Sequence, residues 1–335
     1  TNPSFVMSDS LTLVTIYNST NGNQWEDNSG WLTEEPFCSW FRVTCENERV
    51  VAINLGGNEL SGEIPLEIGN LTELTSLRLS YNDIGGTIPV SIGNLDLLEI
   101  LDLSYNYIGG NIPSEIGNLV NLEYFESAVN DHIGEIPPEI GQLTNLTLLE
   151  LWNNEMTGPL PSELGDLVAL ERLWLTGNNF SGEIPVSLGN LSNLTMLRLS
   201  ANQLTGQIPN ELMNLSNLEE LRLTNNNLTG PIPDNIGDLT SLNRLHLHLN
   251  QLSGELPASI VYLSNLERLK LRDNNLSGLI PTDICDLNLY MGPFSIYNNN
   301  FCPPYPLCIR DYVGEQNISD CENPPSPDNL QVIES

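Results

Sequence analysis

Leucine and isoleucine recur along this chain in a pattern that fits short strands. In the stretch from Leu194 to Asn217 the order is L-x-x-L-x-L, and Leu197 and Leu199 alternate with polar residues at a period of two. Such alternation predicts a strand with one buried face. Two later apolar columns, from Ile64 to Ile280 and from Leu71 to Leu287, are expected to close the core from the side where the chain returns.

The pattern repeats every 24 residues. Glycine follows the asparagine of each unit by four places, from Gly62 to Gly278, and proline follows three places later, from Pro65 to Pro281. The ten asparagines in this register are Asn58, Asn82, Asn106, Asn130, Asn154, Asn178, Asn202, Asn226, Asn250 and Asn274. One unit cannot bury its apolar face alone, so the units must stack, and their strands then pair into a parallel sheet. Glycine and proline bend the return side and exclude a long helix there.

The asparagine column is expected to lie just past the sheet, where the chain turns inward. A buried asparagine amide can satisfy backbone groups that a bend would leave without partners. We therefore expect each asparagine to bond its own turn and the next.

The unit L-x-x-L-x-L-x-x-N-x-L-x-G-x-I-P-x-x-I-G-x-L-x-x resembles the plant-type leucine-rich-repeat class, which includes receptor-kinase ectodomains and polygalacturonase-inhibiting proteins. The segment Phe37 to Cys45 resembles the N-cap of that class, C-x-W-x-G-V-x-C, with Arg42 where glycine is common. The resemblance covers residues 8–321. It implies an α/β repeat fold: a right-handed leucine-rich-repeat solenoid with a concave parallel β-sheet, an extracellular location and a ligand-binding concave face. It implies no particular ligand.

The resemblance also sets the expected organisation. Residues 1–49 form an N-terminal cap with a helix around Ser8 to Tyr17 and a Cys38–Cys45 disulfide, and residues 50–287 hold ten repeats. Residues 288–321 hold an imperfect eleventh repeat, through Phe294, Ile296 and Asn299, and a C-terminal cap. Residues 322–335, which contain prolines and acids, are expected to form a linker or tail.

The six cysteines lie only near the two ends of the chain, as expected of disulfides on terminal caps in an oxidising compartment. The last four allow three pairings, and the nearly equivalent places of Cys285 and Cys308 in successive units favour Cys285–Cys308 with Cys302–Cys321. A zinc site is the alternative, but no C-x-x-C pair is present. Ten N-x-S/T sequons agree with secretion, and no apolar run is long enough to span a membrane.

Charge makes nucleic acid and anionic lipid poor partners, because 43 acidic residues against 11 basic ones give a net charge of −32. The bases are nevertheless concentrated. Seven of them occupy the third, fifth or seventh place of repeats 6 to 10, which face outward on the concave side: Arg172, Arg198, Arg222, Arg244, Arg268, Lys270 and Arg272. Glu220 is the one acid at those places, although glutamates at the second place of a unit are alternative partners for the arginines.

Repeats 1 to 5 show the opposite charge at the same places, with Asp102, Glu126 and Glu150 in one column and Arg78 as the only base. An apolar and aromatic zone separates the two regions: Ile100, Tyr124, Leu148, Trp152, Trp174 and Met196, bordered by Tyr81 and Tyr105. Exposed tryptophan beside arginine is typical of binding hot spots. Two weaker alternatives for the acidic column are a Ca²⁺ site and a glycosidase-like carboxylate pair.

These observations predict an extracellular recognition module that binds an anionic oligosaccharide or an acidic peptide or protein. The predicted ligand-binding residues are Tyr124, Trp152, Trp174, Arg172, Arg198, Arg222, Arg244, His246, Arg268, Lys270 and Arg272. His246 and His248 flank Lys270 and Arg272 and are candidates for pH sensitivity. We expect no cofactor, metal or catalytic residue. A structural matrix or cell-wall protein without a specific ligand is the second interpretation, and a glycan-active enzyme the third.

Repeat 4 departs from the consensus. Ser127 and His132 replace core leucine or isoleucine. Both changes are expected to weaken local packing, and either a kink or a protruding loop at Val129 to Ile133 is expected to follow.

Overall fold

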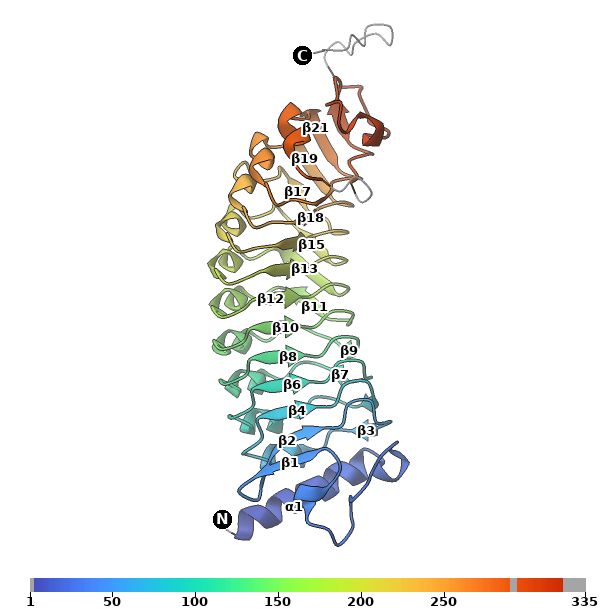
Figure 1. The fold of residues 1–335 in the computed structure, drawn as a ribbon, viewed down its shortest axis with the longest axis vertical. Coiled ribbons are helices and arrows are strands. Elements are labelled where there is room, and N and C mark those ends of the chain that lie inside the picture. The colour runs from blue at the N-terminus through green and yellow to red at the C-terminus, as the bar shows by residue number, and fades with distance from the viewer. Residues whose placement is uncertain (1–2, 290–293, 322–335) are drawn as a thin grey trace. The chain divides into compact units, whose positions relative to one another are not determined.

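The computed structural model describes residues 3–289 and 294–321. Contacts within the chain define two compact units, Thr1–Phe180 (unit 1) and Ser181–Ser335 (unit 2). In each unit a short strand, a turn, a second short strand and a 3-10 helix recur with the period of the sequence pattern (Figure 1). Each repeat packs its apolar residues against those of the next repeat. The buried residues of successive repeats therefore form one continuous core within a unit.

The main strands of unit 1 follow one another in sequence order. They are β1 (Val43–Glu46), β2 (Arg49–Asn54), β4 (Ser76–Arg78), β6 (Ile100–Asp102), β8 (Tyr124–Glu126), β10 (Leu148–Glu150) and β12 (Arg172–Trp174). β1 and β2 pair antiparallel, and the later strands pair parallel, because every repeat returns the chain to the same edge before the next strand begins. The register places Arg78, Asp102, Glu126, Glu150 and Trp174 side by side on successive strands.

Unit 2 repeats this arrangement with β14 (Met196–Arg198), β16 (Glu220–Arg222), β18 (Arg244–His246) and β20 (Arg268–Lys270). All are parallel, and the register aligns Arg198, Arg222, His246 and Lys270 in one column. The middle leucine of each strand, such as Leu221, is fully buried. The flanking residues of each strand therefore face away from the core, as the period of two predicted.

Short second strands line one edge of the main strands and 3-10 helices line the other (Figure 1). The second strands are β3 (Ser61–Glu63), β5 (Asp83–Gly85), β7 (Gly109–Gly110), β9 (Asp131–His132), β11 (Thr157–Pro159), β13 (Asn179–Glu183), β15 (Gln203–Thr205), β17 (Thr229–Gly230), β19 (Gln251–Glu255), β21 (Asn275–Leu279) and β22 (Asn300–Cys302). The 3-10 helices are η1 (Gly22–Gln24), η2 (Phe37–Ser39), η3 (Leu66–Asn70), η4 (Val90–Asn94), η5 (Ser114–Asn118), η6 (Pro138–Gln142), η7 (Ser162–Asp166), η8 (Val186–Asn190), η9 (Asn210–Asn214), η10 (Ile236–Asp238), η11 (Ala258–Tyr262), η12 (Thr282–Asp286) and η13 (Arg310–Tyr312). A proline precedes most of them and limits each to about one turn.

The asparagine column forms a buried ladder in both units. In unit 1, Nδ2 of Asn82 donates to the carbonyls of Leu79 and Leu55, both at 2.9 Å, and Oδ1 accepts from the backbone nitrogen of Leu60 at 2.9 Å. The prediction of a buried ladder is confirmed, but its direction was wrong. Each asparagine bonds its own turn and the preceding one, because the carbonyls and amides left open by a turn point toward the repeat that follows it.

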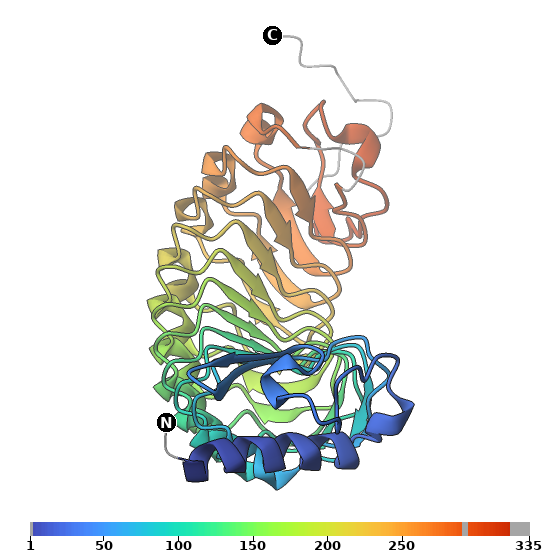
Figure 2. The same cartoon turned by 60° about the horizontal axis from the view of Figure 1, so that its bottom comes forward.

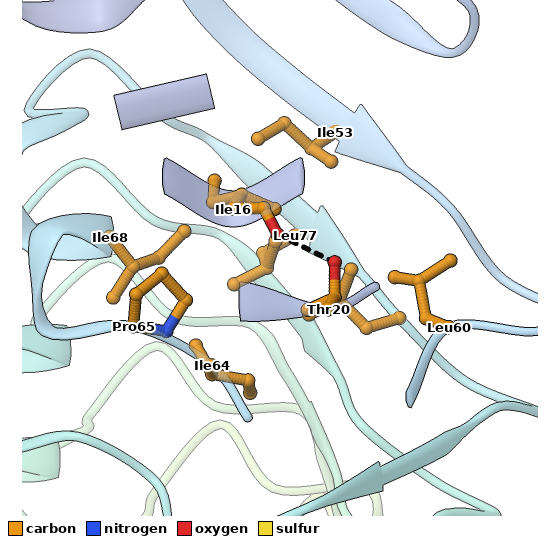
Figure 3. A pocket seen from close by; sticks show the side chains of 9 residues that line it. Ile16, Thr20, Ile53, Leu60, Ile64, Pro65, Ile68 and Leu77 are labelled. Atoms are coloured by element: carbon orange, nitrogen blue, oxygen red, sulfur yellow. Dashed lines mark hydrogen bonds between the residues drawn. The ribbon is translucent and has the colours of Figure 1, made fainter. Parts of the chain in front are cut away.

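The N-terminal cap is built on α1 (Pro3–Ser19), which begins five residues before the predicted helix. Proline is tolerated in the first turn, where its missing N–H has no helical partner. Figure 2 shows α1 lying across the end of unit 1, beside the first repeat. The contact leaves only a small apolar cavity of about 10 Å³ (Figure 3), in which Thr20 Oγ1 donates to the carbonyl of Ile16 at 2.6 Å. A cavity of that size holds about one water molecule and is no ligand site.

All three predicted disulfides are confirmed: Cys38–Cys45, Cys285–Cys308 and Cys302–Cys321. The zinc alternative for the last four cysteines is therefore wrong. The imperfect eleventh repeat continues the ladder, since Asn299 Oδ1 accepts from the backbone nitrogen of Leu276 at 3.0 Å. The predicted linker, residues 322–335, lies outside the described residues.

The two residues by which repeat 4 departs from the consensus contact each other. Ser127 and His132 are both fully buried, and Ser127 Oγ lies 2.7 Å from Nε2 of His132. The backbone nitrogen of His132 donates to Asn154 Oδ1 at 3.0 Å, so the ladder passes through this repeat without interruption. Burial is the main reason that the pKa of His132 falls to about 4. The segment also pairs through β9 with β7.

Candidate ligand-binding faces

The predicted ligand-binding residues lie on the main strands or directly after them, on the side opposite the buried leucines. We call this side the sheet face. Tyr124, Trp152, Arg172 and Trp174 belong to unit 1, and the other predicted residues, Arg198, Arg222, Arg244, His246, Arg268, Lys270 and Arg272, belong to unit 2. Each unit therefore presents its own group of candidates.

In unit 2 a single buried carboxylate holds three arginines. Glu220 has 3% of its side chain exposed, and its Oε1 accepts from Nε of Arg198 at 2.6 Å while its Oε2 accepts from Nη1 of Arg244 at 3.1 Å. Arg222 forms the third ion pair. Burial acts to raise the pKa of Glu220, but the hydrogen bonds and charges of the three arginines outweigh it, so this pKa lies below its ordinary value. Glu220 thus brings three guanidinium groups together around one carboxylate.

The remaining bases of unit 2 extend this positive region, which we call the basic cluster: Arg198, Glu220, Arg222, Arg244, Arg268, Lys270 and Arg272. Arg272 pairs with Asp273, and its guanidinium carbon lies 5.6 Å from the centre of the Tyr297 ring. Within residues 3–289 and 294–321, neither Arg268 nor Lys270 forms an ion pair. Burial and then the charges of neighbouring arginines lower the pKa of Lys270.

The two histidines of this region are largely covered. His246 is 6% exposed and His248 is 9% exposed. Burial, followed by the charges of Lys270 and Arg222, lowers the pKa of His246 to about 3, and burial followed by Arg272 and Lys270 lowers that of His248 to about 4. Both rings are therefore neutral over the ordinary pH range. His246 lies between Arg222 and Lys270 in the register of the parallel strands.

In unit 1 the same column of the sheet face carries three half-buried carboxylates. Oδ2 of Asp102 accepts from Ser80 Oγ at 2.6 Å, and its Oδ1 accepts from the backbone nitrogen of Ser104 at 3.1 Å. Burial, followed by the charges of Asp102 and Glu150, raises the pKa of Glu126, and Arg78 opposes this only in part. Three acidic side chains thus stand on adjacent strands of this face, with Arg78 on the next strand of the same column.

Aromatic rings flank these carboxylates. The rings of Tyr81 and Tyr105 stack with centres 4.2 Å apart, and those of Trp152 and Trp174 stack at 4.7 Å. Tyr105 meets Trp152 edge to face at 5.8 Å. Tyr124, predicted as a binding residue, is 39% exposed on β8. The predicted aromatic zone of unit 1 is therefore a set of mutually supported rings that remain accessible.

Neither a group of metal-ligating side chains nor a membrane-spanning helix is found among the described residues. No group of three or more histidine, cysteine, aspartate or glutamate side chains among the described residues is placed to hold a metal ion. In the described part of the chain, no helix has the length and apolar character needed to cross a membrane.

Sequence reasoning placed Glu220 on the sheet face but missed its role as the centre of the basic cluster. The signal was present, because Glu220 is the one acid among the bases at those places. The exposed glutamates at the second place of a unit, Glu219 and Glu267, form no ion pair among the described residues. The partner of the arginines is the buried carboxylate instead.

The stacked strands, the asparagine ladder and the disulfide-bonded caps define a leucine-rich-repeat solenoid. Comparison with known families agrees: the model described as "Leucine-rich repeat region" matches residues 114–230, and that described as "Leucine Rich Repeat" matches residues 49–71, 73–95, 97–119 and 265–287. The chain therefore belongs to the leucine-rich-repeat family.

Within that family the chain is similar to plant receptor-kinase ectodomains. It is 39% identical to the Arabidopsis thaliana GASSHO1/SCHENGEN3 ectodomain, solved in complex with CASPARIAN STRIP INTEGRITY FACTOR 2, with a TM-score of 0.84 over 88% of this chain and 36% of that one. It is 33% identical to the Arabidopsis HAESA ectodomain, solved with an extended IDA peptide hormone, with a TM-score of 0.75 over 89% of this chain and 50% of that one. A 60-residue segment, 17% of this chain, is 43% identical to the Arabidopsis thaliana LRR receptor-like serine/threonine-protein kinase EFR. The chain spans only 6% of that kinase and at most half of the two ectodomains.

Proposed function

We propose that this protein is an extracellular recognition module that binds an anionic ligand, preferably an acidic peptide or protein segment, on the basic cluster of unit 2. The observation that carries this proposal is the concentration of positive charge. Six of the 11 lysines and arginines of a chain with net charge −32 lie on one sheet face. A protein with few bases that places most of them together creates a local field opposite to that of the rest of its surface.

The geometry supports recognition of carboxylate, sulfate or phosphate groups. Glu220 holds Arg198, Arg222 and Arg244 by their guanidinium groups, so these side chains are already ordered before a ligand arrives. A preorganised site loses less conformational entropy on binding. Arg268 and Lys270, which form no ion pair in the described chain, are the groups with most donor capacity left for an anion.

One observation supports an extracellular site, and a second favours a peptide ligand over an anionic oligosaccharide. Three disulfides join all six cysteines, which suits an oxidising compartment. The GASSHO1/SCHENGEN3 and HAESA ectodomains, which share this fold, were solved with peptide ligands.

The test is a screen of synthetic acidic peptides and anionic oligosaccharides, followed by the triple variant Arg222→Ser, Arg244→Ser, Lys270→Ser. Removing three like-signed contacts is expected to weaken binding of the selected ligand by at least about tenfold, and added salt is expected to weaken wild-type binding. Arg268→Ser and Arg310→Ser form a matched pair of single charge removals, since Arg310 lies on η13, away from the main strands. Only the first is expected to reduce affinity. A ligand indifferent to the triple variant contradicts the proposal, and failure to bind any probe favours the structural-matrix interpretation.

A further inference from the structure

The ten N-x-S/T sequons are all exposed, and none stands on a sheet face. Their asparagines are Asn18, Asn70, Asn145, Asn179, Asn190, Asn193, Asn214, Asn227, Asn275 and Asn317. No sequon begins at the third, fifth or seventh place of the ten repeats, which are the places that face outward from the main strands. N-linked glycans are bulky groups on surface asparagines of such sequons. Glycans at these sites would therefore leave both sheet faces uncovered.

The sheet faces carry the hydroxyl of the sequon but not its asparagine. Five repeats have serine or threonine at the seventh place, where asparagine at the fifth place would complete a sequon. These pairs are Arg78 with Ser80, Asp102 with Ser104, Trp174 with Thr176, Arg198 with Ser200 and Arg222 with Thr224. The fifth place is asparagine once, at Asn54, and there the seventh place is Gly56. Sequons are thus missing from the sheet faces although the hydroxyl groups that they need are present.

In unit 2 three sequons stand beside the two ends of the main strands, which we call the rims of the sheet face. Asn193 lies three residues before Met196, where β14 begins, on the side of the 3-10 helices. Asn227 and Asn275 lie three residues after the seventh places of their repeats, on the side of the second strands (Figure 1). Three residues span at most about 10 Å. Both rims of unit 2 therefore have sequons within about 10 Å of outward places.

Each sequon on the side of the second strands uses the second of two consecutive asparagines. The first is the ladder asparagine: Asn226 is buried, and its Nδ2 donates two bonds of 3.0 Å to backbone carbonyls. Asn227 beside it is exposed. Asn274 and Asn275 divide the two roles in the same way. A glycan on the second asparagine therefore leaves the ladder intact.

The outward places form a narrow strip between the two rims. From the third to the seventh place a strand advances four residues, or about 13 Å. A folded domain of about 100 residues has a radius of gyration of about 13 Å, so it is at least twice as wide as this strip. A single extended chain takes up about 5 Å in the plane of a sheet. Bulky groups on both rims would therefore obstruct a folded domain but not an extended peptide.

We propose that Asn193, Asn227 and Asn275 carry N-linked glycans that border the sheet face of unit 2 on both rims and restrict it to a slender ligand, a single extended chain of an acidic peptide. The glycans require passage through a secretory compartment. The restriction deepens the proposed function and rests on it, because it selects a peptide segment over a folded acidic protein.

The first measurement is the occupancy of the sequons in the full chain produced by cultured plant cells. Enzymatic release of the glycans in heavy-oxygen water converts each modified asparagine to a labelled aspartate, which peptide mass spectrometry assigns. We expect Asn193, Asn227 and Asn275 to be modified in most molecules. Thr229→Ser keeps the sequon of Asn227 and is expected to keep its glycan, whereas Thr229→Ala is expected to lose it. A rim without any modified asparagine overturns the proposal, and the anionic ligand of unit 2 is untouched by that result.

The second measurement uses Lys270 as a reporter of access to the sheet face, because it is the only lysine of the sequence and lies on β20. A small activated acetate ester reacts with its amine, and the same ester is also presented on a folded carrier protein of about 100 residues. Peptide mapping measures the reaction at Lys270 alone. The ratio of the two rates reports how far the surroundings exclude a folded partner, since the reactivity of the amine cancels in it.

Two triple variants separate the rims from the rest of the surface. Asn193→Gln, Asn227→Gln and Asn275→Gln remove the rim glycans, and this variant is expected to raise the rate with the carrier at least about fivefold and to change the rate with the small ester less than about twofold. Asn70→Gln, Asn190→Gln and Asn214→Gln remove three sequons at the ends of η3, η8 and η9, on the return side. This matched control is expected to change neither rate more than about twofold.

Two outcomes of the second measurement overturn the restriction to a slender ligand. The first is a carrier rate that does not rise in the rim variant although the rim asparagines are modified in the wild type. The second is an equal rise in the rim variant and the return-side variant, which would assign the effect to glycan bulk anywhere on the chain. Neither readout involves an anionic ligand. Failure of the proposed function would show separately, as a ligand that is indifferent to loss of Arg222, Arg244 and Lys270.

Discussion

The sheet faces of the two units have the same backbone and opposite chemistry. In unit 2 the third place of the repeat that contains β16 carries Glu220, which is buried and pairs with three arginines. In unit 1 the fifth places of the repeats that contain β6, β8 and β10 carry Asp102, Glu126 and Glu150. The ladder hydrogen bonds and the buried leucines are alike in both. The repeat therefore fixes the positions of the side chains. The residues at the third, fifth and seventh places of each repeat determine the charge of each sheet face.

The difference also shows how a face is ordered. The basic cluster is ordered by ion pairs around one carboxylate, whereas the aromatic side chains on the sheet face of unit 1 are ordered by ring contacts, as between Trp152 and Trp174 at 4.7 Å. Ion pairs on an exposed face weaken with salt, but ring contacts do not. Salt is therefore expected to loosen the face of unit 2 more than that of unit 1.

The comparison assumes that the asparagine ladders of unit 1 and unit 2 are equivalent. One pair of variants tests this assumption. Asn106 in unit 1 and Asn226 in unit 2 each donate two bonds of 3.0 Å to backbone carbonyls and accept one from a backbone nitrogen. Asn106→Leu and Asn226→Leu are each expected to lower the free energy of unfolding by about 3 to 5 kcal/mol, because buried backbone groups lose their partners. Urea unfolding measures this. A cost present in one unit and absent in the other would show that the ladders differ in burial.

The pH dependence of the unfolding free energy tests the buried histidine in the core of unit 1. The pKa of His132 is about 4 in the folded chain, mainly through burial, and about 6.5 in an unfolded one. Above pH 6.5 both states are neutral at this residue. As the pH is lowered from 6.5 to 4, the unfolded state gains a proton that the folded state does not. The free energy of unfolding therefore decreases, by about 3 kcal/mol in total. Below pH 4 the loss from this residue is complete.

The control is the double variant Ser127→Leu, His132→Leu, which restores the apolar pattern of the other repeats. Its unfolding free energy is expected to depend less on pH between 6.5 and 4 than that of the wild type, when both are measured by urea unfolding. Identical pH profiles would mean that His132 is protonated or hydrated in the folded chain. His246 and His248 contribute in the same direction in both proteins and so cancel in the difference.

The scaffold was predictable from the sequence because its signals repeat. The strand leucines, the asparagine column and the pairing of Cys285 with Cys308 each follow from position within a 24-residue unit. A residue type that recurs in register ten times constrains the fold far more than any single residue. The start of α1 at Pro3 lies outside the repeats and was missed.

The sequence predicted on which face the candidate residues lie, but not which side chains contact one another. Sequence reasoning treated Ser127 and His132 as two separate losses from the core, yet the turn between them brings their polar atoms to 2.7 Å. It also placed Glu220 among exposed residues, although three arginine side chains cover it. Both cases depend on how side chains fold over one another, and the period of a repeat carries no information about that.

The smallest expected effect tests whether Glu220 organises the basic cluster. Glu220→Gln keeps the shape of the side chain but removes the charge that Arg198, Arg222 and Arg244 share. Since these arginines are 16% to 35% exposed, water takes over part of their solvation, and the unfolding free energy is expected to fall by only about 1 to 2 kcal/mol. The matched control Glu219→Gln removes the same charge from the exposed neighbouring residue and is expected to cost less than about 0.5 kcal/mol. Thermal unfolding at low and at high salt measures both, and high salt is expected to narrow the difference, because screening weakens the repulsion among the three guanidinium groups. Equal costs for the two variants would mean that Glu220 does not organise the basic cluster, and the contrast between the two faces would then be one of composition alone.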